Sequence, residues 1–597
     1  MFKNKLSKAS FAALLAFSAL PVTAAHATTE GTSLTTQVKG ADVSYKAALE
    51  DAAALTYAND KNVSFSSYDA VTYLARANYP VAKNYYDTYY NAVEKAVANN
   101  FDGFYSIGVY EKTIVALRAI GKDATNVAGV NLVEHMLQQA ATLKEKNTLT
   151  ENDVFWLLLA TDASDLIASD ASISLQTLVT FLEDKQFENG GFSWSSENEW
   201  GQTPSVDTTA LAITALAPYA TQNEAVQQMI ERGFAYISSE ANDRIGFFSS
   251  YANGDSSDSV AQLIVAQTAM QINPQTDTNF VKNGHWSVRN LLSSYDPIEA
   301  GFQLAPNNVV DGYSTKSATL ALTAYDLYKT KTEAFYDFSH VEAANLAVDE
   351  IAPNAPKVKT TVSDKTIAIE GLSEKYATVT IKNGTKTVGS TLVNGDGSWH
   401  IKLSKQVAGT SLRVVTTDTA GNTSAATSIT VLDKTAPNVP TITTTVSDRT
   451  TTISGTAEKG ATVVVKNGTK TIATTKATSS GKWSVKIPKQ KAKTTLTITA
   501  TDAAKNQSVA KKVIVLDRTA PTVPKVNAIK KGAKKITGTT EKGATVVVKI
   551  GSKSYKKTVS TTKFSITVPA LKAKQIVKVY AVDAAKNQSK TVSKKVN

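Results

Sequence analysis

The strongest constraint on the fold is a threefold internal repeat in the C-terminal part of the chain. The dipeptide Ala-Pro recurs at Ala352, Ala436 and Ala520, a constant spacing of 84 residues. Other marks follow it in the same order in each copy: Gly371, Gly455 and Gly538; Trp399, Trp483 and Phe564; and turns that begin at Asp418, Asp502 and Asp583. A repeat of this length, with its marks in a constant order, predicts three copies of one domain.

Each copy has the sequence pattern of a small β-domain. Stretches of alternating apolar and polar residues, such as 461–466 and 495–501, are separated by Asn-Gly, Gly and Pro turn signals. About seven strands fit in each copy, which is the strand number of an immunoglobulin-like sandwich. We therefore expect three all-β immunoglobulin-like sandwiches, over residues 346–434, 435–518 and 519–597.

The motifs of these copies resemble the bacterial Ig-like repeats of surface proteins. The resemblance rests on the Asp-Lys/Arg-Thr-Ala-Pro openings, the Gly-x-x-Glu-Lys segment and the Asp-x-Ala-x-Asn turn, and it covers residues 350–597. It implies a spacer or stalk, often adhesive, without catalysis.

Carboxylates recur at the points where one copy joins the next. In a sandwich of this topology, one linker acid and two loop acids should lie at the same pole of the domain. The three triplets are Asp349, Glu374 and Asp418; Asp433, Glu458 and Asp502; and Asp517, Glu541 and Asp583. Clustered carboxylates are the ligands that Ca²⁺ prefers, so one interpretation is a calcium ion at each joint. In the alternative, the Asp residues form turns and each Glu pairs with the Lys that follows it.

The N-terminus has the order of a secretory signal peptide. Basic residues come first, an apolar run from Phe11 to Leu20 follows, and Ala25-His26-Ala27 offers a cleavage site, so we expect a signal peptide over residues 1–27. No later stretch has the roughly 18 apolar residues of a membrane helix. The chain has no cysteine, which excludes disulfides and thiolate metal sites.

Residues 28–345 have the pattern of a helical domain. About twelve helices are expected there in pairs, and the second member of each pair is the more apolar. These second helices should begin near Ser67, Tyr110, Asn152, Ser205, Ser257 and Ser314. Polar helices alternating with apolar ones suggest an outer ring packed around an inner ring.

Several loops before the apolar helices carry Gly followed by Phe, at residues 103–104, 191–192, 246–247 and 301–302. With the segments 186–192 and 204–210, these marks resemble prenyltransferase and squalene-cyclase repeats, which implies an all-α (α/α)6 toroid; 205–212 is also similar to the helical domain of cobalamin carriers. The Asp-x-Asp-Asp-Thr-Ala motif of the cyclases is reduced here to one acid, Asp207, and the Cys that holds prenyltransferase zinc is absent. The resemblance therefore supports the fold more than the chemistry.

Five of the six apolar helices carry an acid near their start. These are Asp69, Glu111, Asp153, Asp207 and Asp258, with Lys316 in the sixth. Such acids offset the helix dipole and the unpaired N–H groups, which is the structural interpretation. The functional interpretation is a polar rim around a ligand pocket, formed by Asp207 and Asp258 with Trp194, Trp200, Phe247 and Tyr251 as stacking surfaces.

Positive charge is concentrated in the last copy. The whole chain has a net charge of +12, whereas residues 521–597 hold 18 lysines against Glu541 and Asp583, a net of +16. Such a field attracts polyanions, and in an exported protein we expect an anionic cell-wall polymer or a glycosaminoglycan in preference to nucleic acid. The alternative is a lysine-rich surface that is merely well solvated.

The sequence leaves three functions open. The leading hypothesis is a secreted, non-catalytic surface protein, held non-covalently at a Gram-positive-type wall, in which the toroid binds an unknown ligand. A second is a secreted polysaccharide-acting enzyme, a glycosidase or lyase, with Asp153 and Asp207 as the pair to test. A third is a host-binding adhesin.

Overall fold

The computed structural model of the chain describes residues 35–38, 41–163, 173–195, 203–250, 252–306 and 308–597. Contacts divide the chain into two compact units. The first comprises Met1–Thr361, Ile367–Ser404 and Ser411–Ile429, which is the helical region with most of the first repeat. The second comprises Val362–Thr366, Lys405–Thr410 and Thr430–Asn597.

The N-terminal region is helical, as the sequence predicts. Its α-helices in the described residues are α1 (Tyr45–Asp60), α2 (Tyr68–Arg76), α3 (Tyr85–Ala98), α4 (Ile107–Ala119), α5 (Leu132–Glu145), α6 (Glu151–Ala163), α7 (Leu175–Lys185), α8 (Val206–Leu216), α9 (Glu224–Glu240), α10 (Ser257–Ala269), α11 (Ser287–Ser293) and α12 (Gly312–Lys331). Short antiparallel pairs interrupt them: β1 (Thr35–Val38) with β2 (Ala41–Ser44), β3 (Phe248–Ser249) with β4 (Gly254–Asp255), and β5 (Tyr295–Asp296) with β6 (Gly301–Phe302). The even-numbered helices begin within three residues of the expected positions.

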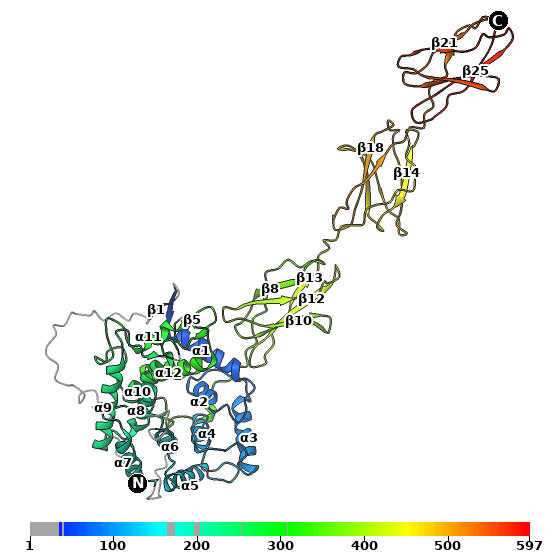
Figure 1. The fold of residues 1–597 in the computed structure, drawn as a ribbon. Helices are drawn as coiled ribbons and strands as arrows, with labels where there is room; N and C mark the ends of the chain where they lie inside the picture. The colour runs from blue at the N-terminus through cyan, green and yellow to red at the C-terminus, as the bar shows by residue number, and fades with distance from the viewer. Residues whose placement is uncertain (1–34, 39–40, 164–172, 196–202, 251, 307) are drawn as a thin grey trace. The chain divides into compact units, whose positions relative to one another are not determined.

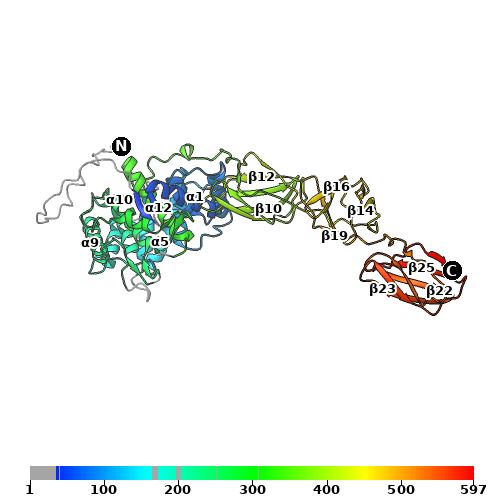
Figure 2. The ribbon, with the colours of Figure 1, turned by 90° about the horizontal axis from the view of Figure 1, so that it is seen from above.

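The even-numbered helices pack against one another in succession. Contacts run from α2 to α4, α6, α8, α10 and α12, and α12 also contacts α2, so the series closes on itself (Figures 1 and 2). Of the odd-numbered helices, α5 packs on α4 and α6, α9 on α8, α11 on α10, and α1 on α12 and α2. The burial patterns agree: α9 buries one stripe that includes Val226, Met229, Ile230 and Ile237, whereas α12 is buried on most sides.

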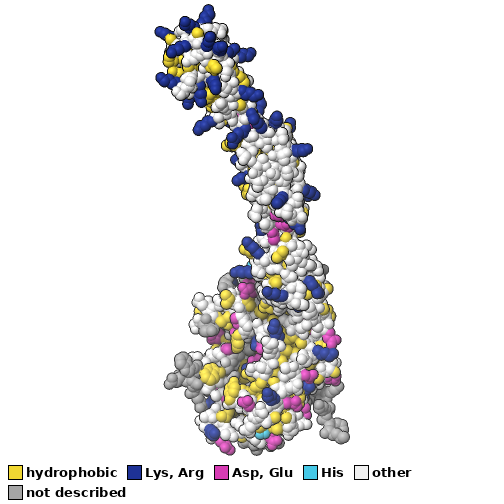
Figure 3. Space-filling model, turned by 90° about the vertical axis from the view of Figure 1, so that its right-hand side faces the viewer, with side chains coloured by type: hydrophobic (Ala, Val, Ile, Leu, Met, Phe, Trp, Pro, Cys, Tyr) yellow, Lys and Arg dark blue, Asp and Glu magenta, His cyan; other side chains and the backbone are white. Residues whose placement is uncertain are grey.

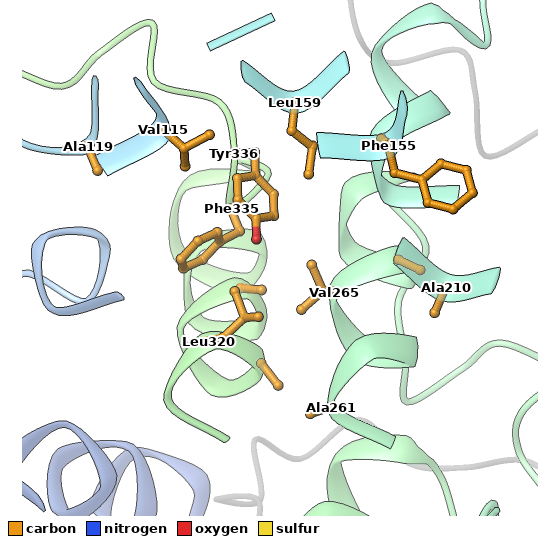
Figure 4. Close-up of a cluster of buried hydrophobic side chains, with 14 of the residues drawn as sticks. Val115, Ala119, Phe155, Leu159, Ala210, Ala261, Val265, Leu320, Phe335 and Tyr336 are labelled. Carbon is orange, nitrogen blue, oxygen red and sulfur yellow. The ribbon is translucent and has the colours of Figure 1, made fainter. Parts of the chain in front are cut away.

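Apolar side chains fill the middle of this cycle of helices. Figure 4 shows side chains from α4, α6, α8, α10 and α12 converging, together with Phe335 and Tyr336 from the segment that follows α12. The ring of Phe335 lies 5.9 Å from that of Tyr73 on α2, and the ring of Tyr336 lies 6.3 Å from that of Trp156 on α6. A buried ion pair of 2.6 Å between Arg76 and Glu333 fixes the start of this segment.

The C-terminal region consists of paired sheets, as predicted. The first repeat has β7 (Lys357–Val358), β8 (Ala368–Leu372), β9 (Thr378–Asn383), β10 (Lys386–Leu392), β11 (Ser398–Lys402), β12 (Ser411–Thr417) and β13 (Thr427–Thr430). The second has β14 (Thr452–Thr456), β15 (Thr462–Asn467), β16 (Lys470–Lys476), β17 (Lys482–Lys486), β18 (Thr495–Thr501) and β19 (Lys511–Ile514). The third has β20 (Lys525–Val526), β21 (Lys535–Thr539), β22 (Thr545–Ile550), β23 (Lys553–Thr558), β24 (Lys563–Thr567), β25 (Ile576–Val582) and β26 (Val592–Lys595).

Each repeat has a four-stranded sheet of the same order, which is β10-β9-β12-β13, β16-β15-β18-β19 and β23-β22-β25-β26. The opposite sheets are β11-β8-β7, β14-β17 and β20-β21-β24. The second repeat thus has six strands in place of the expected seven. Its first segment still pairs, because the amide of Thr441 donates to the carbonyl of Thr456 at 2.8 Å.

The glycine and the aromatic residue that recur in every copy lie opposite each other on neighbouring strands of one sheet. Gly455 lies opposite Trp483, and a Cβ on Gly455 would come within 2.9 Å of the indole and 1.9 Å of the Thr441 carbonyl oxygen. Gly371 with Trp399 and Gly538 with Phe564 repeat the arrangement. Glycine is required at this mark because the buried ring lies where a side chain would be.

Candidate ligand-binding face of the helical domain

The acids at the starts of the even-numbered helices lie close enough together to change the pKa of neighbouring side chains. Burial raises the pKa of Asp258, on α10, to about 6, and the charges of Asp311 and Asp207 add to this rise. The pKa of Tyr313, on α12, is raised by desolvation of its hydroxyl and then by the charges of Asp258, Asp207 and Asp69. Side chains from α2, α8, α10 and α12 therefore gather at the N-terminal end of the cycle.

Local capping accounts for some of the polar residues at these helix starts. Asp153 accepts hydrogen bonds from the amide and hydroxyl of Thr150 at 3.0 and 2.7 Å, while its own amide donates to that hydroxyl at 3.2 Å. At α8 and α10 the caps are instead Ser205 and Ser256. Asp153 thus has a structural use, whereas Asp207 is exposed and Asp258 is half-buried.

Two other residues at the starts of the even-numbered helices, Lys316 and Glu111, do not belong to the rim. Lys316 forms an ion pair of 2.7 Å with Asp60 at the end of α1. Glu111, on α4, is fully buried, and neither of its carboxylate oxygens has a hydrogen-bond partner among the residues that the structure describes. Burial raises the pKa of Glu111 well above its usual range, and the charge of Asp153 adds to the effect. A neutral acid inside the helical core is the form that this environment favours.

A narrow cleft with no room for a water molecule lies beside Asp69. Its lining residues are Asp69, Thr72, Tyr73, Lys112, Val115, Trp156 and Tyr336. The Lys112 ammonium lies 3.4 Å from the Asp69 carboxylate and 5.1 Å from the centroid of the Trp156 ring. Sequence reasoning did not identify Lys112 or Trp156. In the sequence, Lys112 directly follows Glu111, and Trp156 lies three residues after Asp153. This closeness to two acids at helix starts is the only sequence signal for the two residues.

The aromatic residues of the loops divide into buried and exposed ones. Trp194 is 45% exposed and its stacking role stays a prediction, whereas Phe247 is only 4% exposed and belongs to the core. Its neighbour Phe248 is 73% exposed, and Tyr105 in the loop before α4 is 85% exposed. The assignment of Phe247 to a stacking surface is therefore wrong, and its neighbour Phe248 is the exposed ring of the pair. Trp200 and Tyr251 lie outside the described residues.

The Gly-Phe marks explain this division. In all four marks the Phe is buried: Phe104, Phe192, Phe247 and Phe302. The first-turn hydroxyl of α8, on Thr209, accepts from the Phe192 amide at 2.8 Å, and Thr315 on α12 accepts in the same way from Phe302 at 3.0 Å. Phe192 and Phe302 thus anchor their loops to the helices that follow. Residues next to or near the mark, such as Tyr105 and Phe248, are left to face solvent.

The carboxylates at the repeat joints are held by asparagine side chains. In the second repeat, the Asn506 amide nitrogen donates to Asp502 at 2.9 Å and to Asp433 at 3.3 Å. Asn587 joins Asp583 and Asp517 at the same distances, and Asn422 joins Asp418 to the carbonyl of Asp349. In the second and third joints an amide N–H group therefore lies between the two Asp carboxylates, where a cation would otherwise be expected, whereas in the first joint it contacts the backbone carbonyl of Asp349.

Of the three glutamates in the triplets, Glu374 is close to its partners. Burial raises its pKa, and the charges of Asp418 and Asp349 raise it further. Glu541 accepts a hydrogen bond from the Thr522 amide at 2.9 Å, and Glu458 is exposed. Within the described residues, no group of three or more His, Cys, Asp or Glu side chains could hold a metal ion. Calcium at the joints stays a prediction.

The third repeat carries its lysines on the surface. Figure 3 shows Lys and Arg side chains distributed over this repeat, at the top of the view. On its four-stranded sheet, Lys549 on β22 lies directly opposite Lys578 on β25. Like charges in opposite positions destabilise a sheet unless an anion lies between them. In the described part of the chain, no helix is long and apolar enough to span a membrane.

Comparisons with known proteins bear mainly on the repeats. Residues 352–433, 436–517 and 520–597 match the bacterial Ig domain family, so the chain carries three such domains. A stretch of 149 residues, 25% of this chain, is 31% identical to the cell wall-associated protease of Bacillus subtilis (strain 168). The chain spans only 16% of the length of that protein.

Solved structures match at low similarity. A structure titled biofilm associated protein, BSP domain, is 14% identical with a TM-score of 0.15, and the match covers 41% of this chain and 66% of that one. The FN1–FN3 domains of chicken CNTN1 are 11% identical with a TM-score of 0.17, and the match covers 41% and 99% of the respective chains.

Proposed function

We propose that this is an exported, cell-surface-associated binding protein. Residues 1–27 are its signal peptide, residues 28–345 form an (α/α)6 toroid that binds a ligand, and three Ig-like repeats follow over 346–434, 435–518 and 519–597. The bacterial Ig domains and the similarity to a cell wall-associated protease support a surface location. The closed series of contacts among the even-numbered helices supports the toroid.

The observation that carries the binding function is the place of the exposed aromatic side chains. Tyr105, Trp194 and Phe248 all lie in loops that lead into even-numbered helices, and Tyr313 lies in the first turn of α12. We propose that these exposed aromatic rings, together with Asp207 and Asp258 at the helix starts, form the binding surface. A ligand with flat apolar faces and polar edges, such as a sugar chain, fits this combination. Asp207 and Asp258 would accept hydrogen bonds from its hydroxyl groups.

Binding of the full chain to a panel of bacterial wall and host glycans, by calorimetry or an array, tests the proposal. Trp194→Ala and Phe248→Ala should each weaken the best binder about fivefold or more, since a buried aromatic anchor contributes at least about 1 kcal/mol. Val509→Ala, at an exposed position of the second repeat, is the matched control. Unchanged affinity in both aromatic variants would rule out this face as the site. A best binder among host glycans would favour the adhesin.

A polysaccharide-acting enzyme is a second candidate, because one acid of the rim titrates near neutral pH. Asp258, with a pKa of about 6, could donate a proton, while the exposed Asp207 nearby could act as a base or nucleophile. Of the pair Asp153 and Asp207 expected from the sequence, Asp153 serves as a helix cap. Release of reducing ends from a bound glycan, abolished by Asp258→Asn and by Asp207→Asn, would establish this function. Binding without turnover would leave the non-catalytic one.

A further inference from the structure

The first repeat differs from the other two at a turn where all three adopt the same backbone conformation. Its Lys375 is followed by Tyr376, where Lys459 and Lys542 are followed by glycine. The three residues have φ values of +59° for Tyr376, +77° for Gly460 and +84° for Gly543. A positive φ suits glycine and strains a tyrosine. A Cβ at Gly460 or Gly543 would meet nothing within 4 Å, so those turns are open to solvent.

The strained tyrosine of the first repeat contacts the helical domain. Its hydroxyl donates to the carbonyl of Ala300 at 2.8 Å and to that of Glu299 at 3.2 Å, and its side chain is buried. Both carbonyls belong to the turn between β5 and β6, which begins the loop that leads into α12. The single hydroxyl proton of Tyr376 is thus shared between two backbone acceptors of one turn of the helical domain.

The neighbouring lysine forms a second contact to the same place. Lys375 Nζ lies 2.6 Å from Asp51 on α1, and the other oxygen of Asp51 accepts a short hydrogen bond from the Tyr295 hydroxyl. The Asp51 side chain is mostly buried, and a buried carboxylate needs such a partner. Tyr295 lies on β5, so both residues of the Lys-Tyr turn act on one hairpin.

A second loop of the first repeat, at Gly395, also lies close to the turn of Glu299 and Ala300. A Cβ on Gly395 would lie 2.4 Å from the Glu299 carbonyl oxygen and 2.8 Å from the Ala300 Cβ. The corresponding residues of the other repeats, Ser479 and Ser560, do carry side chains. A residue with a side chain at position 395 would separate the two surfaces, so glycine there follows from the close approach.

The connecting segment is fixed as well. The Asp349 amide donates to the Val81 carbonyl at 2.7 Å, and Val81 and Val348 form a parallel bridge. Lys83 pairs with Glu350 at 2.9 Å, although both of these side chains are exposed. The chain between the helical domain and the first repeat therefore follows the surface of the helical domain instead of forming a free linker.

We propose that the first Ig-like repeat is a built-in part of the helical head: through Lys375, Tyr376 and Gly395 it holds the β5–β6 hairpin and the loop that leads into α12. The sequence change from glycine to tyrosine at an otherwise repeated turn is the signature of this role. This inference does not depend on the proposed ligand, since it rests only on contacts within the first structural unit. Its consequence for binding is that the repeat supports one of the loops next to the aromatic rim.

Hydrogen exchange of the full chain, followed by mass spectrometry, tests the proposal. Tyr376→Gly relieves the backbone strain and removes both hydrogen bonds, so peptides covering residues 295–303 should exchange about tenfold faster or more. Gly395→Leu should have the same effect by a steric route. Tyr376→Phe should have a smaller effect, because it removes only the hydroxyl.

The controls separate loss of the contact from loss of the fold. Lys505→Gly, at a position of the second repeat with a φ of +71°, relieves the same kind of strain and should leave residues 295–303 unchanged. Protection of β9 and β12 must persist in every variant, which shows that the first repeat is still folded. Unchanged exchange at residues 295–303 in both Tyr376→Gly and Gly395→Leu would overturn the proposal.

Discussion

Asp258→Asn should stabilise the helical domain at pH 8 and have little effect at pH 4. The pKa of Asp258 is raised from 3.8 to about 6, chiefly by burial. An acid with a raised pKa binds its proton more tightly in the folded state, so stability falls as the pH rises from about 4 to about 6. Above that window the folded protein carries the full cost of an ionised, buried carboxylate. Below it the group is neutral in both states, and asparagine is a near isostere of that neutral form.

The size of the effect follows from the pKa change. A rise of about two pKa units corresponds to about 2 to 3 kcal/mol, at about 1.4 kcal/mol per unit. For a helical domain of this size, that free energy raises the melting temperature by about 3 to 5 °C. The ellipticity at 222 nm reports mainly on the helical domain, so its melting curve in the full chain at pH 4 and pH 8 is a suitable assay.

A second substitution tests the physical cause. The charge of Asp207 contributes to the raised pKa of Asp258, so Asp207→Asn should move the pH dependence to lower pH without removing it. Asp207 is exposed, and its substitution alone should change the melting temperature little. If Asp258→Asn destabilises the domain equally at both pH values, the contribution of this side chain does not depend on its ionisation, and the reasoning from burial is refuted.

Two predictions concern the repeats. Because exposed charges are screened beyond roughly 8 Å at physiological salt, cell-bound protein should be released by about 1 M salt, and deletion of residues 521–597 should send it to the medium; retention after both would mean that another domain holds the surface. If calcium binds the joints, millimolar Ca²⁺ should raise the melting temperature of residues 346–597 and a chelator should lower it. Asn506→Asp, which exchanges the bridging amide for a third carboxylate, should strengthen any calcium effect at that joint. If neither the unaltered protein nor Asn506→Asp responds to calcium or chelator, the asparagine bridge alone accounts for the joint.

The repeats could be predicted well from the sequence because their recurring residues are required by contacts within a single repeat. Gly455 and Trp483 recur together since the ring occupies the space above the glycine, and this pairing is repeated in every copy. The helix starts could be predicted equally well, because caps such as Ser205 and Asp311 immediately precede the apolar helices.

Other features depend on contacts between distant residues. A Gly-Phe-Phe segment does not indicate which ring turns inward, so Phe247 and Phe248 could not be told apart without the core around them. The segment that carries Phe335 and Tyr336 lies beyond the last predicted helix, and nothing in its local pattern indicates that it enters the helical domain. The Gly-to-Tyr change at residue 376 was visible in the aligned repeats, but its meaning requires the carbonyls of Glu299 and Ala300.

The filled centre of the helical domain bears on which kind of ligand it can take. An enzyme that folds a long apolar substrate inside a ring of helices needs an interior cavity, and here Phe335 and Tyr336 pack against Tyr73 and Trp156 in that position. Removing these rings would leave a cavity and cost about 3 to 5 kcal/mol each, so the segment is held in place by the same packing that closes the interior. The Tyr336 side chain also forms part of the narrow cleft beside Asp69. We therefore place the proposed binding site at the rim, through Tyr105, Trp194 and Phe248, and a rim of this kind suits an extended ligand that lies across the loops.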